Sequence, residues 1–176
     1  MTTLNFDNTQ NAFAYKPNYE LIRDYQIFRL INQGWLVKFG TRAASKMMDA
    51  GFKIPVAIGM RPTIYAVFCG GDTLQLSTKK INQLYQYKVQ SIIDYGVEGK
   101  ESEADFEHGL KETLATIEMA KSNSHIPFCV FKVTGLARFG LLEKVSAQEV
   151  LSPAESEEWK RVKDRVKKIC GLAYQY

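Results

Sequence analysis

One lysine, Lys132, lies within an otherwise apolar run that is typical of a strand. Pro127 and Gly135 mark the two ends of an apolar run within residues 126–136 (IPFCVFKVTGL). Its β-branched and aromatic side chains predict a strand buried on both faces. An ammonium group in such a strand costs several kcal/mol unless a carboxylate or a cavity receives it. Lys132 is therefore a candidate for a cation that binds an anion at the end of a strand.

Two acidic residues are candidates for partners of this lysine. Residues 89–97 predict a second short strand that ends near Asp94, and Glu98 follows just beyond it. Side chains alternate along a strand, which puts Lys132 on the same face as Val130. Lys132 and Asp94 are thus expected at neighbouring strand ends, with Glu98 at the rim. A lysine–aspartate pair in this position is either a structural ion pair or part of a binding site, and the residues leave both readings open.

The elements that would position these residues alternate between helix and strand. Apolar spacing predicts helices over 18–34, 36–50, 54–61, 72–87 with Asp72 as N-cap, 102–121, 137–145 and 152–176, the last begun by Ser152 as N-cap and Glu155 as capping glutamate. Pro62 breaks the third segment, and residues 63–68 are open between strand and helix, with continuity favouring helix. Residues 89–97 and 126–136, with one helix between them, form a parallel βαβ unit of an α/β protein. Ligands bind at the carboxyl ends of such strands. We expect residues 1–66 to form a helical arm that precedes this part.

Two strands are far fewer than the eight of a closed barrel, and neither carries edge protection. The α/β part, residues 67–176, therefore looks like the front of a longer domain whose barrel is incomplete in this chain. A small complete domain that pairs these strand edges in an oligomer stays open as an alternative.

Composition excludes several classes of function. The net charge of +4 is mild, and the basic run 160–168 is explained by complementarity with the helix dipole, so we predict no nucleic-acid partner. Three widely spaced cysteines and two isolated histidines predict neither disulfides nor a metal site. The chain shows no signal or transit peptide and no apolar run of membrane-spanning length, which favours a cytoplasmic protein.

Three segments resemble the proline dehydrogenase family: residues 68–73 (FCGGDT), 93–102 (IDYGVEGKES) and 126–138 (IPFCVFKVTGLAR). The resemblance runs from about residue 5 to the C-terminus. It implies a (βα)8 (TIM) barrel with FAD across its C-terminal mouth, in a flavoprotein of proline catabolism. The implied reaction is hydride transfer from L-proline to the flavin, which gives 1-pyrroline-5-carboxylate. Electrons would then pass to a membrane quinone, which implies peripheral contact with the inner membrane.

Position by position, the resemblance makes Lys132 the residue that meets the substrate carboxylate. Asp94 and Glu98 match acidic residues that shape the substrate entrance and hold the lysine by charge. The catalytic groups and almost all FAD contacts of the family are expected beyond residue 176, so this fragment is predicted to be inactive alone. The alternative is a non-catalytic α/β interaction module, or a small-anion-binding module with Lys132 as its anchor.

Overall fold

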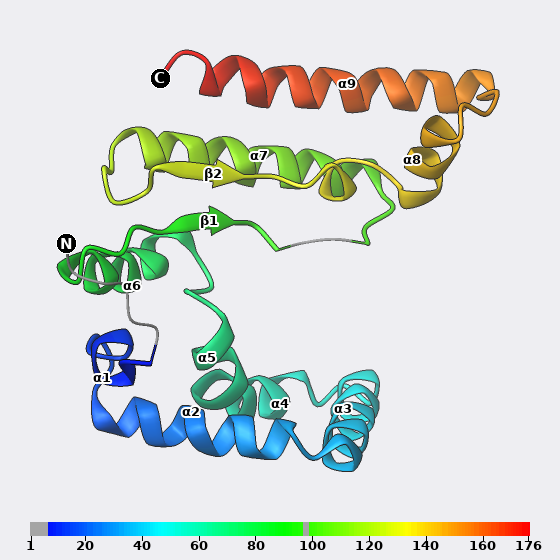
Figure 1. Cartoon of the computed structure of the whole chain (residues 1–176). Helices are drawn as coiled ribbons and strands as arrows, with labels where there is room; N and C mark the ends of the chain where they lie inside the picture. Colours follow the sequence, from blue (N-terminus) through cyan, green and yellow to red (C-terminus); the bar gives the residue numbers. More distant parts are fainter. Residues whose placement is uncertain (1–6, 97–98) are drawn as a thin grey trace. The chain divides into compact units, whose positions relative to one another are not determined.

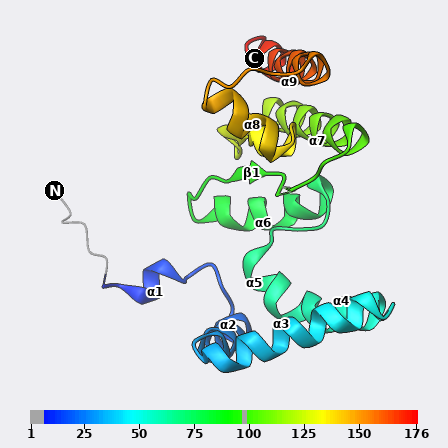
Figure 2. The ribbon, with the colours of Figure 1, turned by 90° about the vertical axis from the view of Figure 1, so that its right-hand side faces the viewer.

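The computed structural model describes residues 7–96 and 99–176, which form two compact units divided between Tyr87 and Lys88. Each unit is treated by itself below, as the N-terminal unit and the C-terminal unit (Figures 1 and 2). The predicted division into an arm, residues 1–66, and the first βα units, residues 67–176, stays a prediction. No helix among the described residues is long and apolar enough to cross a bilayer.

The N-terminal unit is entirely helical in its described part. Its elements are α1 (Thr9–Ala12), α2 (Asn18–Ile31), α3 (Gly34–Asp49), α4 (Lys53–Met60), the π-helical η1 (Arg61–Tyr65), α5 (Ala66–Phe68) and α6 (Leu74–Gln86). The helix predicted over residues 63–68 is confirmed. Pro62 has no backbone N–H to donate, and the chain passes through this point as a π-turn instead of ending the helix.

The start of α6 differs from the prediction by one residue. Thr73, not Asp72, is the N-cap, and its hydroxyl accepts a hydrogen bond from the Leu76 N–H at 3.2 Å. Asp72 instead forms an ion pair with Arg61 at 2.8 Å. The preceding Gly71 comes so close to the helix that a Cβ there would lie 2.8 Å from the Ser77 nitrogen, which explains the glycine at this turn.

The C-terminal unit contains the predicted βαβ unit. It comprises β1 (Ile92–Asp94), α7 (Glu103–Lys121), β2 (Phe128–Val130), the 3-10 helix η2 (Val133–Gly135), α8 (Phe139–Ser146) and α9 (Pro153–Ala173). The strands β1 and β2 are parallel, with Ile92 opposite Phe128 and Asp94 opposite Val130. The described chain is thus mostly helical with a small parallel two-stranded sheet, which is compatible with part of an α/β fold.

The prediction that residues 126–136 form a strand buried on both faces is wrong. The ladder is only three residues long, and Phe128 and Val130 are exposed while Cys129 between them is half-buried. Cys129 and Phe131 pack against a core formed by Leu110, Ile117, Leu136 and Ile169. In Figure 1, α7 lies over the sheet and α9 lies over α7. Helices therefore cover one face of β2, and within this unit its other face is open.

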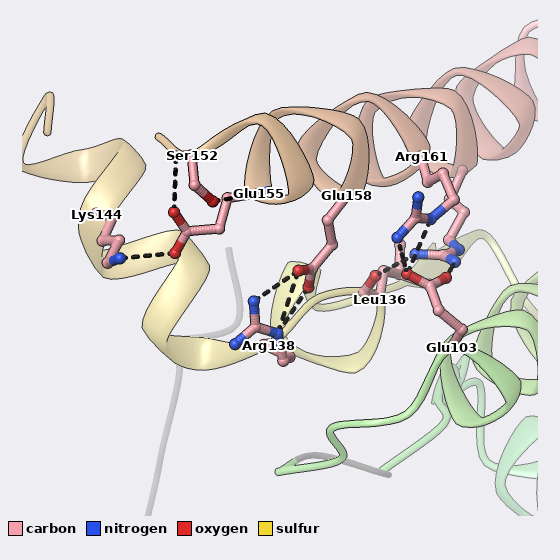
Figure 3. A network of polar contacts seen from close by, with 9 residues as sticks. Glu103, Leu136, Arg138, Lys144, Ser152, Glu155, Glu158 and Arg161 are labelled. Atoms are coloured by element: carbon pink, nitrogen blue, oxygen red, sulfur yellow. Dashed lines mark hydrogen bonds and ion pairs between the residues drawn. The ribbon is translucent and has the colours of Figure 1, made fainter. Parts of the chain in front are cut away.

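The last helix begins with a complete capping box, as predicted. The Ser152 hydroxyl accepts from the Glu155 N–H at 3.3 Å, and the Glu155 carboxylate accepts from the Ser152 N–H at 2.9 Å (Figure 3). Lys144 of α8 adds an ion pair with Glu155 at 2.6 Å. These hydrogen bonds, that from Lys144 first, lower the pKa of Glu155 from 4.5 to about 2.

Replacing Ile169 with alanine tests the core. Ile169 is only 2% exposed, so Ile169→Ala should lower the free energy of unfolding by about 2–5 kcal/mol through lost burial and a residual cavity. Val150→Ala in the same unit is the matched control, because Val150 is 96% exposed and its truncation should change stability by about 0.5 kcal/mol or less. Denaturant unfolding followed by Trp159 fluorescence in a Trp35→Phe background measures both. Equal losses in the two variants would contradict this core.

The capping box predicts a dependence of stability on pH. Because the folded pKa of Glu155 lies below its unfolded value, its stabilisation is present above about pH 4.5 and is lost as pH falls toward about 2. The variant Glu155→Gln should therefore melt below the parent chain at pH 6 and approach it at low pH. Melting temperatures across this range measure the difference. A gap that stays constant down to about pH 2 would show that ionisation of Glu155 is not its source.

Candidate functional site

Lys132 and Asp94 come together as the sequence predicts. The Lys132 Nζ lies 3.0 Å from the Asp94 Oδ2, so the two side chains form an ion pair at the carboxyl ends of β1 and β2. Their side chains are 46% and 37% exposed, respectively. Parallel register explains the meeting, because Asp94 is opposite Val130 and Lys132 follows two residues later on the same side.

Lys132 is not inside the strand, which corrects the prediction of a buried ammonium. β2 ends at Val130, and Lys132 has extended backbone angles at the start of the 3-10 turn Val133–Gly135. Its charge therefore stays in contact with solvent, and the desolvation cost that first singled it out is largely absent. Glu98, the third predicted site residue, lies outside the described residues.

The turn that follows Lys132 is fixed from the helix side by a buried cation that the sequence analysis missed. Arg165 of α9 is 2% exposed, and its Nη1 donates to the Leu136 carbonyl at 3.0 Å. Its Nε donates to Glu107 at 2.9 Å, and it also pairs with Glu103. The available signal was the i, i+4 pair of glutamates on the predicted helix 102–121, which offers carboxylates to a cation on a neighbouring helix.

A glycine brings α7 against the same turn. A Cβ on Gly109 would lie 2.8 Å from the Gly135 carbonyl oxygen, a distance that real Cβ atoms do not show. Backbone therefore packs directly on backbone here, and the turn 133–135 cannot move toward α7.

Arg138 makes a more specific contact than a typical surface cation. Its Nε and Nη2 donate to the two oxygens of Glu158 at 2.9 and 2.6 Å, a bidentate pair that ties the start of α8 to α9. Together with Arg165, it attaches the segment after Lys132 to the last helix.

Tyr95 follows Asp94 in the chain and contacts α7. Its ring meets the His108 ring edge to face, with centroids 5.9 Å apart. Burial, and then the carboxylates of Glu112 and Asp105, raise the pKa of Tyr95. Tyr95 therefore stays protonated at neutral pH, and its position beside α7 indicates a packing role.

Two cavities lined by described residues of β2 do not fit a flavin beside Lys132. The cavity that Lys132 and Tyr95 share with η2 holds about 10 Å³, room for about one water molecule. A larger groove of about 740 Å³ follows β2 between α7 and α9, and its lining is mainly apolar. Lys121, the cation that lines this groove, lies over the Tyr176 ring at 3.8 Å. The described residues thus do not offer the set of donors that a dinucleotide pyrophosphate needs.

Comparisons with known proteins agree with the resemblance seen in the sequence. No family model and no solved structure matches the chain. The mitochondrial proline dehydrogenase 1 of Arabidopsis thaliana is 27% identical over 165 residues, which cover 89% of this chain and 33% of the plant protein. The mitochondrial proline dehydrogenase 1 of Caenorhabditis elegans is 32% identical over 95 residues, 54% of this chain and 15% of that protein.

A bacterial protein matches as well. The carbapenem antibiotics biosynthesis protein CarD of Pectobacterium carotovorum subsp. carotovorum is 26% identical over 110 residues, 62% of this chain and 29% of that protein. The chain spans a third or less of the length of these curated relatives. Taken with the three sequence segments, these matches show that the chain is related to the proline dehydrogenase family.

Proposed function

We propose that this chain contributes the substrate-carboxylate anchor of a proline dehydrogenase, which oxidises L-proline to 1-pyrroline-5-carboxylate. The observation that carries the proposal is the Lys132–Asp94 pair at the shared carboxyl ends of two parallel strands. In α/β proteins with parallel sheets, this edge is where ligands bind. The names of the relatives suggest the reaction, and we propose that the substrate carboxylate binds at the ion pair.

Lys132 has the chemistry that a carboxylate anchor needs. Its ammonium carries three N–H donors, the kind of hydrogen-bonding group that a carboxylate ligand accepts from. A flexible ammonium acts as a point charge and can turn toward a ligand without breaking the register of the strands. Asp94 then orients the ammonium and partly balances its charge before the substrate arrives.

The rigidity of the following turn supports the same role. Arg165 holds the Leu136 carbonyl and Gly109 packs against Gly135, so the backbone that carries Lys132 is ordered before any ligand binds. A ligand that meets a preorganised anchor loses less affinity to ordering of the protein.

The remaining parts of the reaction are proposals that depend on the relatives. We propose, on the basis of the relatives, a distorted (βα)8 barrel, FAD as hydride acceptor, a quinone as electron acceptor and a peripheral membrane contact. We assign no flavin contact and no catalytic group to the described residues, in line with the poor fit of a flavin beside Lys132. We likewise propose, from the sequence, a cytoplasmic location at the inner membrane.

A chimera tests the anchor. Residues of the Arabidopsis relative that match this chain are replaced with those of this chain, and proline-dependent dye reduction is measured. Removal of a charged hydrogen bond to the substrate should lower kcat/KM for L-proline by about 10- to 150-fold in Lys132→Met, mainly through KM. Lys160→Met, an exposed lysine on α9, is the matched control and should leave kcat/KM unchanged.

Competing ligands distinguish a binding role of Lys132 from a structural one. Lys132→Met should weaken inhibition by a cyclic carboxylate and leave inhibition by the corresponding amide unaltered, because the amide has no charge for the ammonium to meet. Equal losses for the acid and the amide would show that Lys132 acts through structure instead of binding. If the isolated 176-residue chain is stabilised against heat by acetate and by proline equally, and Lys132→Met removes the effect, the small-anion-binding alternative is favoured.

The hydrogen bond from Arg165 to the Leu136 carbonyl, which holds the turn after Lys132, predicts a separate effect on stability. Arg165→Met leaves the Leu136 carbonyl without its donor, whereas Glu103 and Glu107 remain exposed enough to be hydrated. We therefore expect a loss of about 1–3 kcal/mol in the free energy of unfolding, with Arg165→Lys intermediate. Lys167→Met, at an exposed position of the same helix, should change stability little. Denaturant unfolding measures all three variants. If Arg165→Met leaves the free energy of unfolding unchanged, the contacts of Arg165 do not stabilise the unit.

A further inference from the structure

Apolar side chains on the open face of the sheet lie beside the Lys132–Asp94 pair. Phe128 and Val130 are on the face of β2 that α7 does not cover, and they are 67% and 38% exposed (Figure 1). Ile92, which is opposite Phe128 in the ladder, is 59% exposed. Next to one cation and one carboxylate, the described strands therefore offer an apolar surface within the C-terminal unit.

Val130 shares a layer of the sheet with the ion pair. Register places Val130 opposite Asp94, and neighbouring strands lie about 4.8 Å apart. The Lys132 Nζ lies 3.0 Å from the Asp94 Oδ2, so the ion pair holds the ammonium close to this layer. Ile92 and Phe128 form the next layer, about 6.6 Å further toward the start of the strands. A ligand held by its carboxylate at the ammonium can thus bring its next few atoms against Val130.

Val130 is suited to act as a rigid wall. Its β-branched side chain has few accessible rotamers, so its methyl groups stay in one place. The ladder with β1 holds the backbone of β2, and the other face of β2 is fixed because Cys129 and Phe131 pack against the core. A wall that cannot move discriminates between ligands by size, because a group that is too large forces side chains or backbone to shift.

We propose that Val130 determines the specificity of this site by selecting carboxylates that carry a small apolar ring. The inference rests on the proposed function, in which Lys132 holds the carboxylate, and it assigns a contact to the part of the ligand that the ammonium does not hold. The ring lies with its methylene groups against the Val130 methyl groups. A simple carboxylate such as acetate is held by the ammonium alone and does not depend on Val130.

Inhibition by a series of acids tests this contact in the Arabidopsis chimera described above. Acetate, cyclopentanecarboxylate and cyclohexanecarboxylate compete with L-proline in dye reduction, and an inhibition constant is measured for each acid. Val130→Ala should raise the constant for cyclopentanecarboxylate by about 3- to 10-fold, because two methyl groups of the wall are lost. The constant for acetate should change by less than about twofold, since acetate has no ring to meet the wall.

Ring size provides a second readout. Val130→Ala widens the space beside the ammonium and should shift the preference toward cyclohexanecarboxylate, whereas Val130→Ile narrows this space and should shift it toward cyclopentanecarboxylate. Val150→Ala is the matched control, because it makes the same truncation at a side chain that is 96% exposed outside the sheet, and it should leave all three constants unchanged. Melting temperatures show whether each variant is folded, and Val130→Ile tests the wall independently if Val130→Ala is not.

Lys132→Met separates failure of the wall from failure of the anchor. This variant should weaken inhibition by all three acids, acetate included, because each of them presents a carboxylate. If acetate still depends on Lys132 while Val130→Ala and Val130→Ile leave the ratio of the two ring acids unchanged, Val130 is not the wall and the anchor stands. Equal losses for acetate and the ring acids in Val130→Ala would also overturn the inference, because Val130 would then act by holding the strand. If Lys132→Met leaves inhibition by acetate unchanged, the anchor is wrong and the inference about Val130 falls with it.

Discussion

The guanidinium of Arg165 is the interaction on which the C-terminal unit depends. It lies inside the protein, and its donors are divided between the backbone carbonyl of Leu136 and two glutamates of α7. The guanidinium also lies over the Phe106 ring, 5.4 Å from its centroid. A buried cation is tolerated only when partners satisfy it, so α7, α9 and the turn after β2 must meet at this point. Close-packed apolar side chains around Leu136 and Ile169 then fill the remaining space.

The side chains of the sheet that pack in the core and those that form the ion pair lie on different sides. The side chains of Cys129 and Phe131 turn toward the helices and contribute to the core, whereas the Lys132–Asp94 pair stays on the side that the helices do not cover. Ordering of the turn by Arg165 and Gly109 positions the ammonium without burying it. An exposed ion pair contributes little to stability, so stability alone does not explain this pair at the strand ends. The carboxylate anchor that we propose would give the pair a role of its own.

The described part of the N-terminal unit buries few side chains and exposes many large apolar ones. Among its described residues, Asp24, Ile27 and Ile81 are buried, and many of its large apolar side chains are exposed. Asp24 is held by Arg23 and Lys16, and these hydrogen bonds outweigh its burial and lower its pKa. A unit with so little buried apolar surface gains correspondingly little from the hydrophobic effect.

The sequence by itself determined the local features. Helix spacing and the capping box of Ser152 and Glu155 follow from periodicity and from interactions within a few residues. The parallel strand–helix–strand order, and with it the meeting of Lys132 and Asp94, follows from the rule for connections between successive parallel strands. The family resemblance came from short segments. Only the tertiary structure decided that β2 is short and covered on one face, and that Arg165 is the buried cation. Burial depends on which elements pack together, and residues that are distant in the chain make that choice.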